Sequence, residues 1–190
     1  IGVALVRFFR SLGVRLTTEV APHHLLLTDE ACAGFDTNAK MNPPLRTDAD
    51  RNALTHGVLE GVIDCIATDH APHAPFEKAQ PFPSAPFGIV GLETALGCIL
   101  HWNRQLPQPL EPLQLVNLMS TAPARLMGLP AGTLQRGAPA DVVVIDPDLR
   151  WRVEATQFRS RSRNTPFNGW ELTGKARYTF VGGALVYRGD

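Results

Sequence analysis

The stretch VIDCIATDHAPH at residues 62–73 decides the expected architecture of this chain. Its first seven residues, 62–68, are mostly apolar, and such a run is typical of a strand buried on both faces of a parallel sheet. A second β-branched stretch, VRLTTEVA at 14–21, stops at Pro22 and predicts another strand. We therefore expect two parallel strands, with polar residues directly after each of them.

Helices are expected around these two strands. Thr47 is a typical N-cap residue, and Asp48 and Asp50 follow it in the first turn. Gly61 ends this helix, which joins the two strands. The other predicted helices span residues 1–13, 92–104 and 112–128. This alternation of strands and helices predicts an α/β fold. Residues 69–91 are expected to form a long, proline-rich loop, and loops of this length are usually functional.

The character of the sequence changes near residue 132. Short β runs are separated there by Gly, Pro and Asn, and Gly182–Gly183 lies between two of them as a two-residue hairpin turn. The predicted strands are 141–145, 178–181 and 184–187. We expect residues 1–131 to form the α/β part and residues 132–190 a small antiparallel β unit that carries none of the chemistry.

Composition excludes several classes of function. The 190 residues carry 18 Lys and Arg against 18 Asp and Glu, so no nucleic-acid or anionic-membrane surface is predicted. Hydrophobic residues make up 44%, which is typical of a chain that buries a core, and no apolar run is long enough for a spanning helix. The three cysteines are widely spaced and odd in number, which favours a reduced, cytoplasmic protein.

Asp69 is the first candidate site residue, because it comes directly after the predicted strand 62–68. Reactive residues of parallel α/β proteins lie at the carboxyl ends of strands, and a carboxylate there can bind a metal ion or act as a base. His70 and His73 follow within one turn. The alternative is a turn-capping aspartate with two solvated histidines, and the density of ionisable groups favours the site.

Other candidates follow the first strand. His23 and His24 are expected to point in opposite directions from an extended segment, so a structural role is favoured over a shared metal ion. Glu19 could reach the same sheet edge, or it could be a buried, hydrogen-bonded carboxylate. Asn42 precedes two prolines, and its amide could hold a substrate carboxylate or imide or could form an Asx-turn.

Several motifs together resemble bacterial dihydroorotases of the amidohydrolase superfamily, the long class with a β-sandwich tail. They are TEVAPHHLLLTDE at 18–30, KMNPPLR at 40–46, VIDCIATDHAPH at 62–73, APFGIVGLETAL at 85–96, APARLMGL at 122–129, GAPADVVVIDP at 137–147 and SRNTPFNGWELTGKARYTFVGGALVY at 162–187. The resemblance implies the carboxy-terminal portion of a (β/α)₈ TIM-type barrel plus a small antiparallel β unit. It also implies a zinc-dependent hydrolase that interconverts (S)-dihydroorotate and N-carbamoyl-L-aspartate in pyrimidine biosynthesis.

The resemblance assigns roles to five residues. Asp69 would be a zinc ligand and the proton shuttle, and Asn42 and His73 would contact the dihydroorotate ring and carboxylate. Phe87 and Gly88 would line the substrate through backbone groups. Glu19 matches a position that binds an extra metal ion in some animal relatives, and it is not included among the site residues.

The sequence also departs from the family pattern. The resemblance calls for a His-x-His, a bridging Lys carbamate or Asp, and two further histidines to hold a binuclear zinc centre, and no His-x-His occurs here. The chain also begins with Ile1. We therefore expect a truncated dihydroorotase that holds the last two barrel strands and is inactive by itself.

Two other interpretations stay open. One is a related cyclic-amide hydrolase, namely a hydantoinase, dihydropyrimidinase or allantoinase. The other is a non-catalytic dihydroorotase-like subunit that scaffolds aspartate transcarbamoylase. Besides the small-molecule substrate, the expected partners are a second copy of the chain or aspartate transcarbamoylase.

Overall fold

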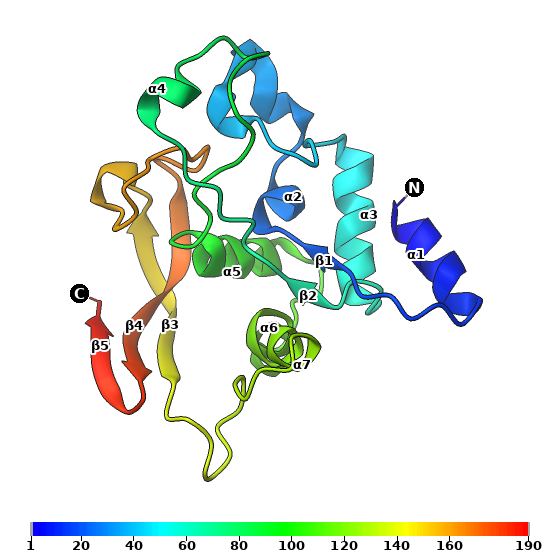
Figure 1. Cartoon of the computed structure of the whole chain (residues 1–190), viewed down its shortest axis with the longest axis vertical. Coiled ribbons are helices and arrows are strands. Elements are labelled where there is room, and N and C mark those ends of the chain that lie inside the picture. Colours follow the sequence, from blue (N-terminus) through cyan, green and yellow to red (C-terminus); the bar gives the residue numbers. More distant parts are fainter. Residues whose placement is uncertain (1, 190) are drawn as a thin grey trace.

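The computed structural model describes residues 2–189, and two short parallel strands lie at its centre (Figure 1). Strand β1 is Glu19–Val20 and strand β2 is Cys65–Ile66, with Glu19 opposite Cys65 and Val20 opposite Ile66. Helices lie around this pair, and a separate three-stranded sheet lies on the side opposite to α1. The parallel pairing of the two predicted strands is confirmed.

Both central strands are shorter than predicted, and side chains explain the difference. The Thr18 hydroxyl donates to the carbonyl of Val62 at 2.8 Å, and the Thr18 amide donates to the Asp64 carboxylate at 2.7 Å. A regular ladder would continue toward the amino ends with a bond between the Thr18 amide and the Val62 carbonyl. Both groups instead bond to side chains. Sequence periodicity reports burial but not this competition for hydrogen bonds.

The predicted helices are present with shifted ends. They are α1 (Gly2–Ser11), α3 (Asp48–Leu59), α5 (Ala95–Gln105), and α6 (Pro112–Val116), which continues through the π-helical turn Asn117–Thr121 into α7 (Ala122–Leu126). The Thr47 hydroxyl accepts a hydrogen bond from the Asp50 amide, as its N-cap position predicts. Two short helices complete the set, α2 (Pro22–Leu26) and α4 (Pro75–Lys78). The sequence predicts one short helix within residues 23–35, whereas α4 was not predicted.

The carboxy-terminal sheet is antiparallel, as predicted, with the order β3–β4–β5. Its strands are β3 (Val142–Arg152), β4 (Glu171–Val181) and β5 (Ala184–Arg188). Gly182 and Gly183 have φ angles of +56° and +81° and form the hairpin turn. Strand β3 runs beyond its predicted end at Ile145, with a register irregularity between Asp146 and Arg150 where Pro147 cannot donate to the ladder.

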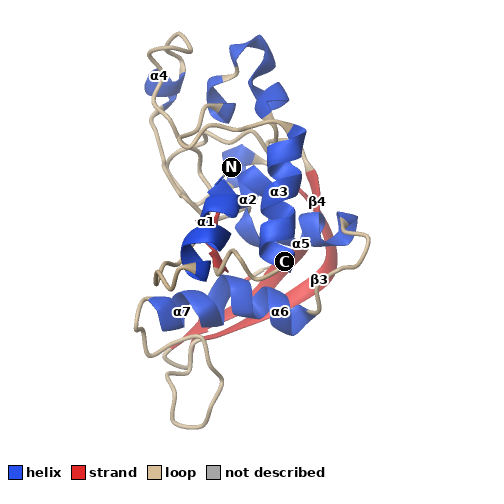
Figure 2. Cartoon of the chain, turned by 90° about the vertical axis from the view of Figure 1, so that its right-hand side faces the viewer, coloured by secondary structure: helices blue, strands red, loops and turns tan. Residues whose placement is uncertain are grey.

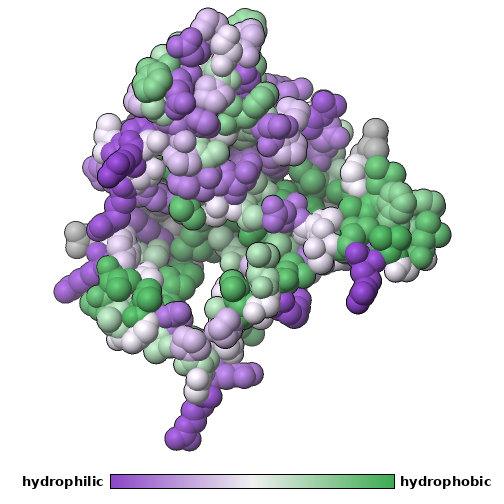
Figure 3. All heavy atoms as spheres, viewed as in Figure 1, coloured by the Kyte–Doolittle hydropathy of each residue, from purple (hydrophilic) through white to green (hydrophobic). Residues whose placement is uncertain are grey.

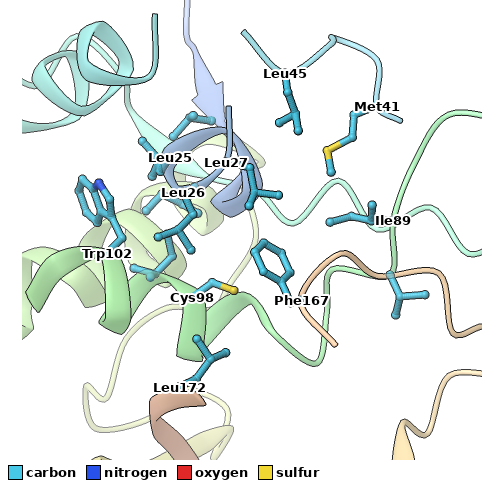
Figure 4. Packing of buried hydrophobic residues seen from close by; sticks show 14 of the residues in the cluster. Leu25, Leu26, Leu27, Met41, Leu45, Ile89, Cys98, Trp102, Phe167 and Leu172 are labelled. Carbon is cyan, nitrogen blue, oxygen red and sulfur yellow. The ribbon is translucent and has the colours of Figure 1, made fainter. Parts of the chain in front are cut away.

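One hydrophobic cluster includes residues from both the α/β part and the β unit. Phe167 lies close to Leu27 and to Cys98 of α5, and Leu172 of β4 lies on the other side of this helix (Figure 4). Figure 2 shows the long curved strands β3 and β4 extending along one side of the molecule past α5. The division into residues 1–131 and 132–190 stays a prediction, but the two parts share a core.

Helix α1 differs from the other long helices because it has no buried residue. Leu5, Phe8 and Phe9 of this helix and Leu12 just after it are exposed. Figure 3 shows a hydrophobic surface at its right, where α1 lies in Figure 1. Polar contacts connect the helix to the rest of the chain: Arg10 pairs with Asp64 at 2.6 Å, and Arg7 pairs with Glu60. None of the helices in residues 2–189 combines the length and the apolar character needed to cross a bilayer.

Candidate active site at the ends of the central strands

A cavity of about 630 Å³ lies beside the carboxyl ends of β1 and β2. Its lining includes six polar residues, namely Glu19, His24, Asn42, Arg46, Asp50 and Asp69. The structure therefore brings four of the sequence candidates, Asp69, Asn42, Glu19 and His24, to one place. A second cavity of about 710 Å³ lies between α3 and residues 105–111 and is lined by none of the predicted site residues.

Asp69 directs its carboxylate outward from the sheet edge through an unusual backbone conformation. Its φ angle is +48°, in the left-handed region that few residues other than glycine adopt and that aspartate tolerates better than most. Its side chain is half exposed. Such outliers at the mouth of a cavity are a common feature of functional sites, and here the turn places a carboxylate where a ligand can reach it.

His23 lies behind Asp69 and is almost fully buried, at 1% exposure. Its Nε2 is 3.9 Å from Oδ2 of Asp69 and has no hydrogen-bond partner among residues 2–189. Burial, together with the smaller effect of the neighbouring His24, lowers the pKa of His23 to about 3. The imidazole is therefore neutral at pH 7, with an unpaired nitrogen facing the carboxylate.

The prediction of an extended segment for His23 and His24 is wrong, because both lie in helix α2. Pro22 occupies the first turn of this helix, where its missing N–H is not needed. The two rings lie side by side with centroids 4.3 Å apart, and Nε2 of His24 is 2.9 Å from the Pro43 carbonyl oxygen. Consequently His23 faces Asp69, whereas His24 supports the segment that carries Asn42.

Glu19 is exposed on the cavity side of β1, so the alternative of a buried carboxylate is wrong. Asn42 is also exposed at the cavity. Both side chains are thus accessible to a small molecule bound next to Asp69.

His73, Phe87 and Gly88 form a neighbouring group of residues in the loop 69–91. Nε2 of His73 is 2.8 Å from the Phe87 carbonyl oxygen, and its Nδ1 is 3.7 Å from Glu77. Gly88 has a φ angle of +114°, and a Cβ at this position would collide with that of Ala71. The Gly88 amide donates to the Lys40 carbonyl at 2.9 Å. Phe87 itself is 52% exposed, so this residue is accessible from solvent.

Sequence analysis missed two buried lysines that hold this loop. Nζ of Lys40 donates to the carbonyls of Phe82, Pro83 and Ala85 at 2.6, 3.1 and 2.5 Å. Nζ of Lys78 donates to the carbonyls of Pro86 and Gly88 at 2.9 and 3.1 Å. Burial lowers the pKa of Lys78, and the charge of Lys40 adds to this. The signal was the run PFPSAP at 81–86, whose three prolines supply carbonyls but no N–H groups.

The described residues do not form a complete metal site. Within residues 2–189 no group of three or more His, Cys, Asp or Glu side chains is placed to hold an ion. Asp69 and the unpaired nitrogen of His23 are two possible donors, whereas zinc in proteins is usually bound by three or four side chains. A binuclear zinc centre therefore does not fit these residues alone.

Comparison with known proteins gives a consistent result. A family model described as the amidohydrolase family matches residues 9–186. The chain is 52% identical over 184 residues to a dihydroorotase of Geobacter sp. (strain M21) and 50% identical over 186 residues to one of Geobacillus kaustophilus (strain HTA426). Each match covers 97% of this chain and 43% of the relative, so the chain spans less than half the length of these curated proteins.

Among solved structures, the chain resembles an L-hydantoinase (dihydropyrimidinase) from Arthrobacter aurescens, with a TM-score of 0.90 and 32% identity. A D-hydantoinase (dihydropyrimidinase) from Thermus sp. gives a TM-score of 0.89 and 25% identity. Both matches cover 98% of this chain and 42% of the solved one.

Proposed function

Because this chain belongs to the amidohydrolase family, we propose that it serves in a dihydroorotase, which interconverts (S)-dihydroorotate and N-carbamoyl-L-aspartate. The observation that carries the proposal is the identity of 50 to 52% with dihydroorotases over nearly the whole chain. The two structurally similar hydantoinases are 32% and 25% identical to the chain. A hydantoinase-like activity is the second candidate, because their backbones match with TM-scores up to 0.90.

The proposed architecture is part of a (β/α)₈ barrel, in which β1 and β2 are neighbouring strands and α3 connects them. Their parallel pairing across a helical crossover supports this arrangement, since parallel neighbours need such a connection. It also explains why the cavity lies at the carboxyl ends of the strands, which is where barrel enzymes carry their sites.

We assign the proton transfers to Asp69. Hydrolysis of a cyclic amide requires that a proton leave the attacking water and that a proton reach the departing nitrogen. A single carboxylate can perform both transfers in turn if it reaches both atoms. Asp69 is half exposed at the cavity, and the neutral His23 imidazole beside it adds no competing charge.

Asn42, His73, Phe87 and Gly88 are the proposed substrate contacts. Asn42 shares the cavity with Asp69, and its amide can pair with the carboxylate or imide of the substrate. His73 would have to exchange its contact with the Phe87 carbonyl for one with the substrate.

The resemblance also implies a binuclear zinc centre, which when bound would polarise the amide carbonyl and increase the acidity of water. Since the residues described here do not fit a complete centre, no metal-dependent step is assigned to them. Association with a second copy or with aspartate transcarbamoylase stays a proposal, and so does a cytoplasmic location.

The test is an assay of the protein expressed from its complete reading frame. Dihydroorotate and N-carbamoyl-L-aspartate should be converted, and hydantoin, dihydrouracil and allantoin should be poor substrates. Asp69→Asn should lower kcat by about 10²- to 10⁴-fold, the usual effect of losing a positioned acid–base group. Asp148→Asn is the matched control, because this carboxylate is exposed and pairs with Arg104 away from the cavity. Preferred turnover of hydantoin, or near-native kcat in Asp69→Asn, would contradict the assignment.

A further inference from the structure

Asn164 is a buried residue of the carboxy-terminal region whose side chain bonds to two loops far away in the sequence. It is 4% exposed. Its Oδ1 accepts the backbone N–H of His73 at 3.1 Å, and its Nδ2 donates to the carbonyls of Ala71 at 3.0 Å and Gly88 at 3.1 Å. Its own carbonyl accepts the amide of Val90 at 2.8 Å. One residue thus connects the segment after β2 with the segment before α5.

The two segments that Asn164 joins carry three of the proposed substrate contacts, His73, Phe87 and Gly88. They also touch each other directly, because the Ala71 amide donates to the Ile89 carbonyl at 2.8 Å and His70 forms a parallel bridge with Ile89. Gly88 lies so close to Ala71 that no side chain fits there. A small change in the relative position of the segments would therefore move His73 against the Phe87 carbonyl, to which its ring is bonded.

The chemistry of asparagine suits this position. A side-chain amide offers one acceptor and two donors in one plane, and all three functions are used here. Aspartate could accept from His73 but could not donate to the two carbonyls, and leucine could do neither. Because the site is buried, an unpaired backbone group would not regain its hydrogen bond from water. Lys78 shares the Gly88 carbonyl, so this peptide group has two independent donors.

We propose that Asn164 is a positioning residue that holds His73 and the Phe87–Gly88 peptide in the relative positions required for substrate binding. The inference rests on the proposed function for its substrate, and it extends the site into the region 132–190, which was expected to carry no chemistry. Asn164 acts through the backbone of the two loops and does not touch the substrate itself.

The experiment uses the protein from the complete reading frame and compares Asn164→Leu with Asn164→Asp. Amide hydrogen exchange is followed by mass spectrometry in peptides covering residues 70–75 and 86–91, and kcat, KM and metal content are measured in parallel. Asn164→Leu should accelerate exchange in both peptides and raise KM for dihydroorotate by about tenfold or more, with kcat and metal content nearly unchanged. Asn164→Asp should accelerate exchange at 86–91 and leave the His73 amide protected, because Oδ1 is retained.

Asn103→Leu is the matched control. Asn103 is also buried, and its amide makes two hydrogen bonds, both to the backbone of Leu110 at the far end of α5. This variant should lower the melting temperature without changing KM or exchange in the two loop peptides.

Unchanged exchange in both Asn164 variants would overturn the inference. So would faster exchange together with a KM equal to that of the Asn103 control, since that combination indicates a purely structural role. If Asn164→Leu does not fold, the Asn164→Asp pattern decides alone. If the unmodified protein converts no dihydroorotate, the proposed function fails. The role of Asn164 in holding the two segments together is then tested by hydrogen exchange alone.

Discussion

At the scale of single residues, His23 shows how strongly burial controls charge in this chain. Its pKa of about 3 in the fold compares with about 6.5 in an unfolded chain. Between these two pH values, His23 is therefore protonated in the unfolded chain and neutral in the folded chain. Since the folded pKa is the lower one, His23 favours the fold fully above pH 6.5, and this contribution is lost as the pH falls toward 3.

This difference predicts an acid-dependent loss of stability. Between pH 7 and pH 5 the free energy of unfolding should fall by about 2 kcal/mol through His23 alone. His23→Gln removes the titrating group and keeps a polar side chain of similar reach, so its unfolding free energy should depend less on pH by that amount. Urea unfolding of the metal-free protein at both pH values is the measurement. His56→Gln, at an exposed histidine of α3, serves as the control, and an equal pH dependence in all three proteins would contradict the burial argument.

Substrate recognition is a second prediction at this scale. His73→Ala and Asn42→Ala should each raise KM for dihydroorotate by about tenfold, because each removes one polar contact with the substrate. Metal content should stay at the level of the unmodified protein, because neither residue is assigned to an ion. Metal analysis of the purified variants checks this point. Loss of bound zinc in His73→Ala would mean that this imidazole is a metal ligand.

At the scale of elements, local signals predicted the elements that depend on local chemistry. Thr47 caps α3, Gly182–Gly183 forms the hairpin, and the apolar run 62–68 contains a parallel strand, all as the sequence indicates. The extended conformation expected for His23 and His24 was wrong, because Pro22 marks the first turn of helix α2, which contains both residues.

Long-range contacts could not be predicted in the same way. The Asp64 side chain accepts a hydrogen bond from the Thr18 amide, 46 residues away in the sequence. The Asn164 side chain accepts one from the His73 amide, 91 residues away. Nothing in the local pattern around Asn164 distinguishes it from the nearby Asn168, whose side chain accepts the Ala155 amide within the same region. The place of Asp69 at the cavity could be predicted because it depends on the end of one strand, whereas the position of His23 beside it depends on the tertiary structure.

The loop between α4 and α5 gives a prediction about a buried cation. Lys40→Met keeps the apolar length of the side chain but removes three donors from the carbonyls of residues 82–85. The free energy of unfolding should fall by about 2–4 kcal/mol, since buried acceptors lose charged partners. Limited proteolysis should cut within residues 79–87 sooner than in the unmodified protein. Lys175→Met, on the partly exposed face of β4, is the control, and equal cleavage of both variants would contradict the role of Lys40.

At the scale of the whole molecule, the surface of this chain includes exposed apolar side chains and unpaired strand edges. The apolar side chains of α1 are exposed, and the central sheet has two strands with open edges. Open edges and exposed apolar faces of this kind favour association with other chains.

We therefore predict that a polypeptide limited to residues 1–190 aggregates or folds only in part, binds no stoichiometric zinc and does not convert dihydroorotate. Light scattering, zinc analysis and the dihydroorotate assay on the purified polypeptide are the measurements. Leu5→Gln together with Phe8→Gln should reduce the aggregation without producing activity, because the change affects the surface and not the site. Zinc-dependent turnover by these 190 residues would require metal ligands other than those identified here.

The position of Phe167 in the shared core has a consequence for protein engineering and for gene recombination. A chimera joined near residue 132 would separate Phe167 and Leu172 from Leu27 and the side chains of α5 that lie around them. The residue at position 164, whose side chain bonds to both loops, would also come from the donor protein. Exchange of the carboxy-terminal sheet between amidohydrolases should therefore succeed only when the donor supplies complementary core side chains, and the sheet and the strand ends must be inherited or redesigned as one unit.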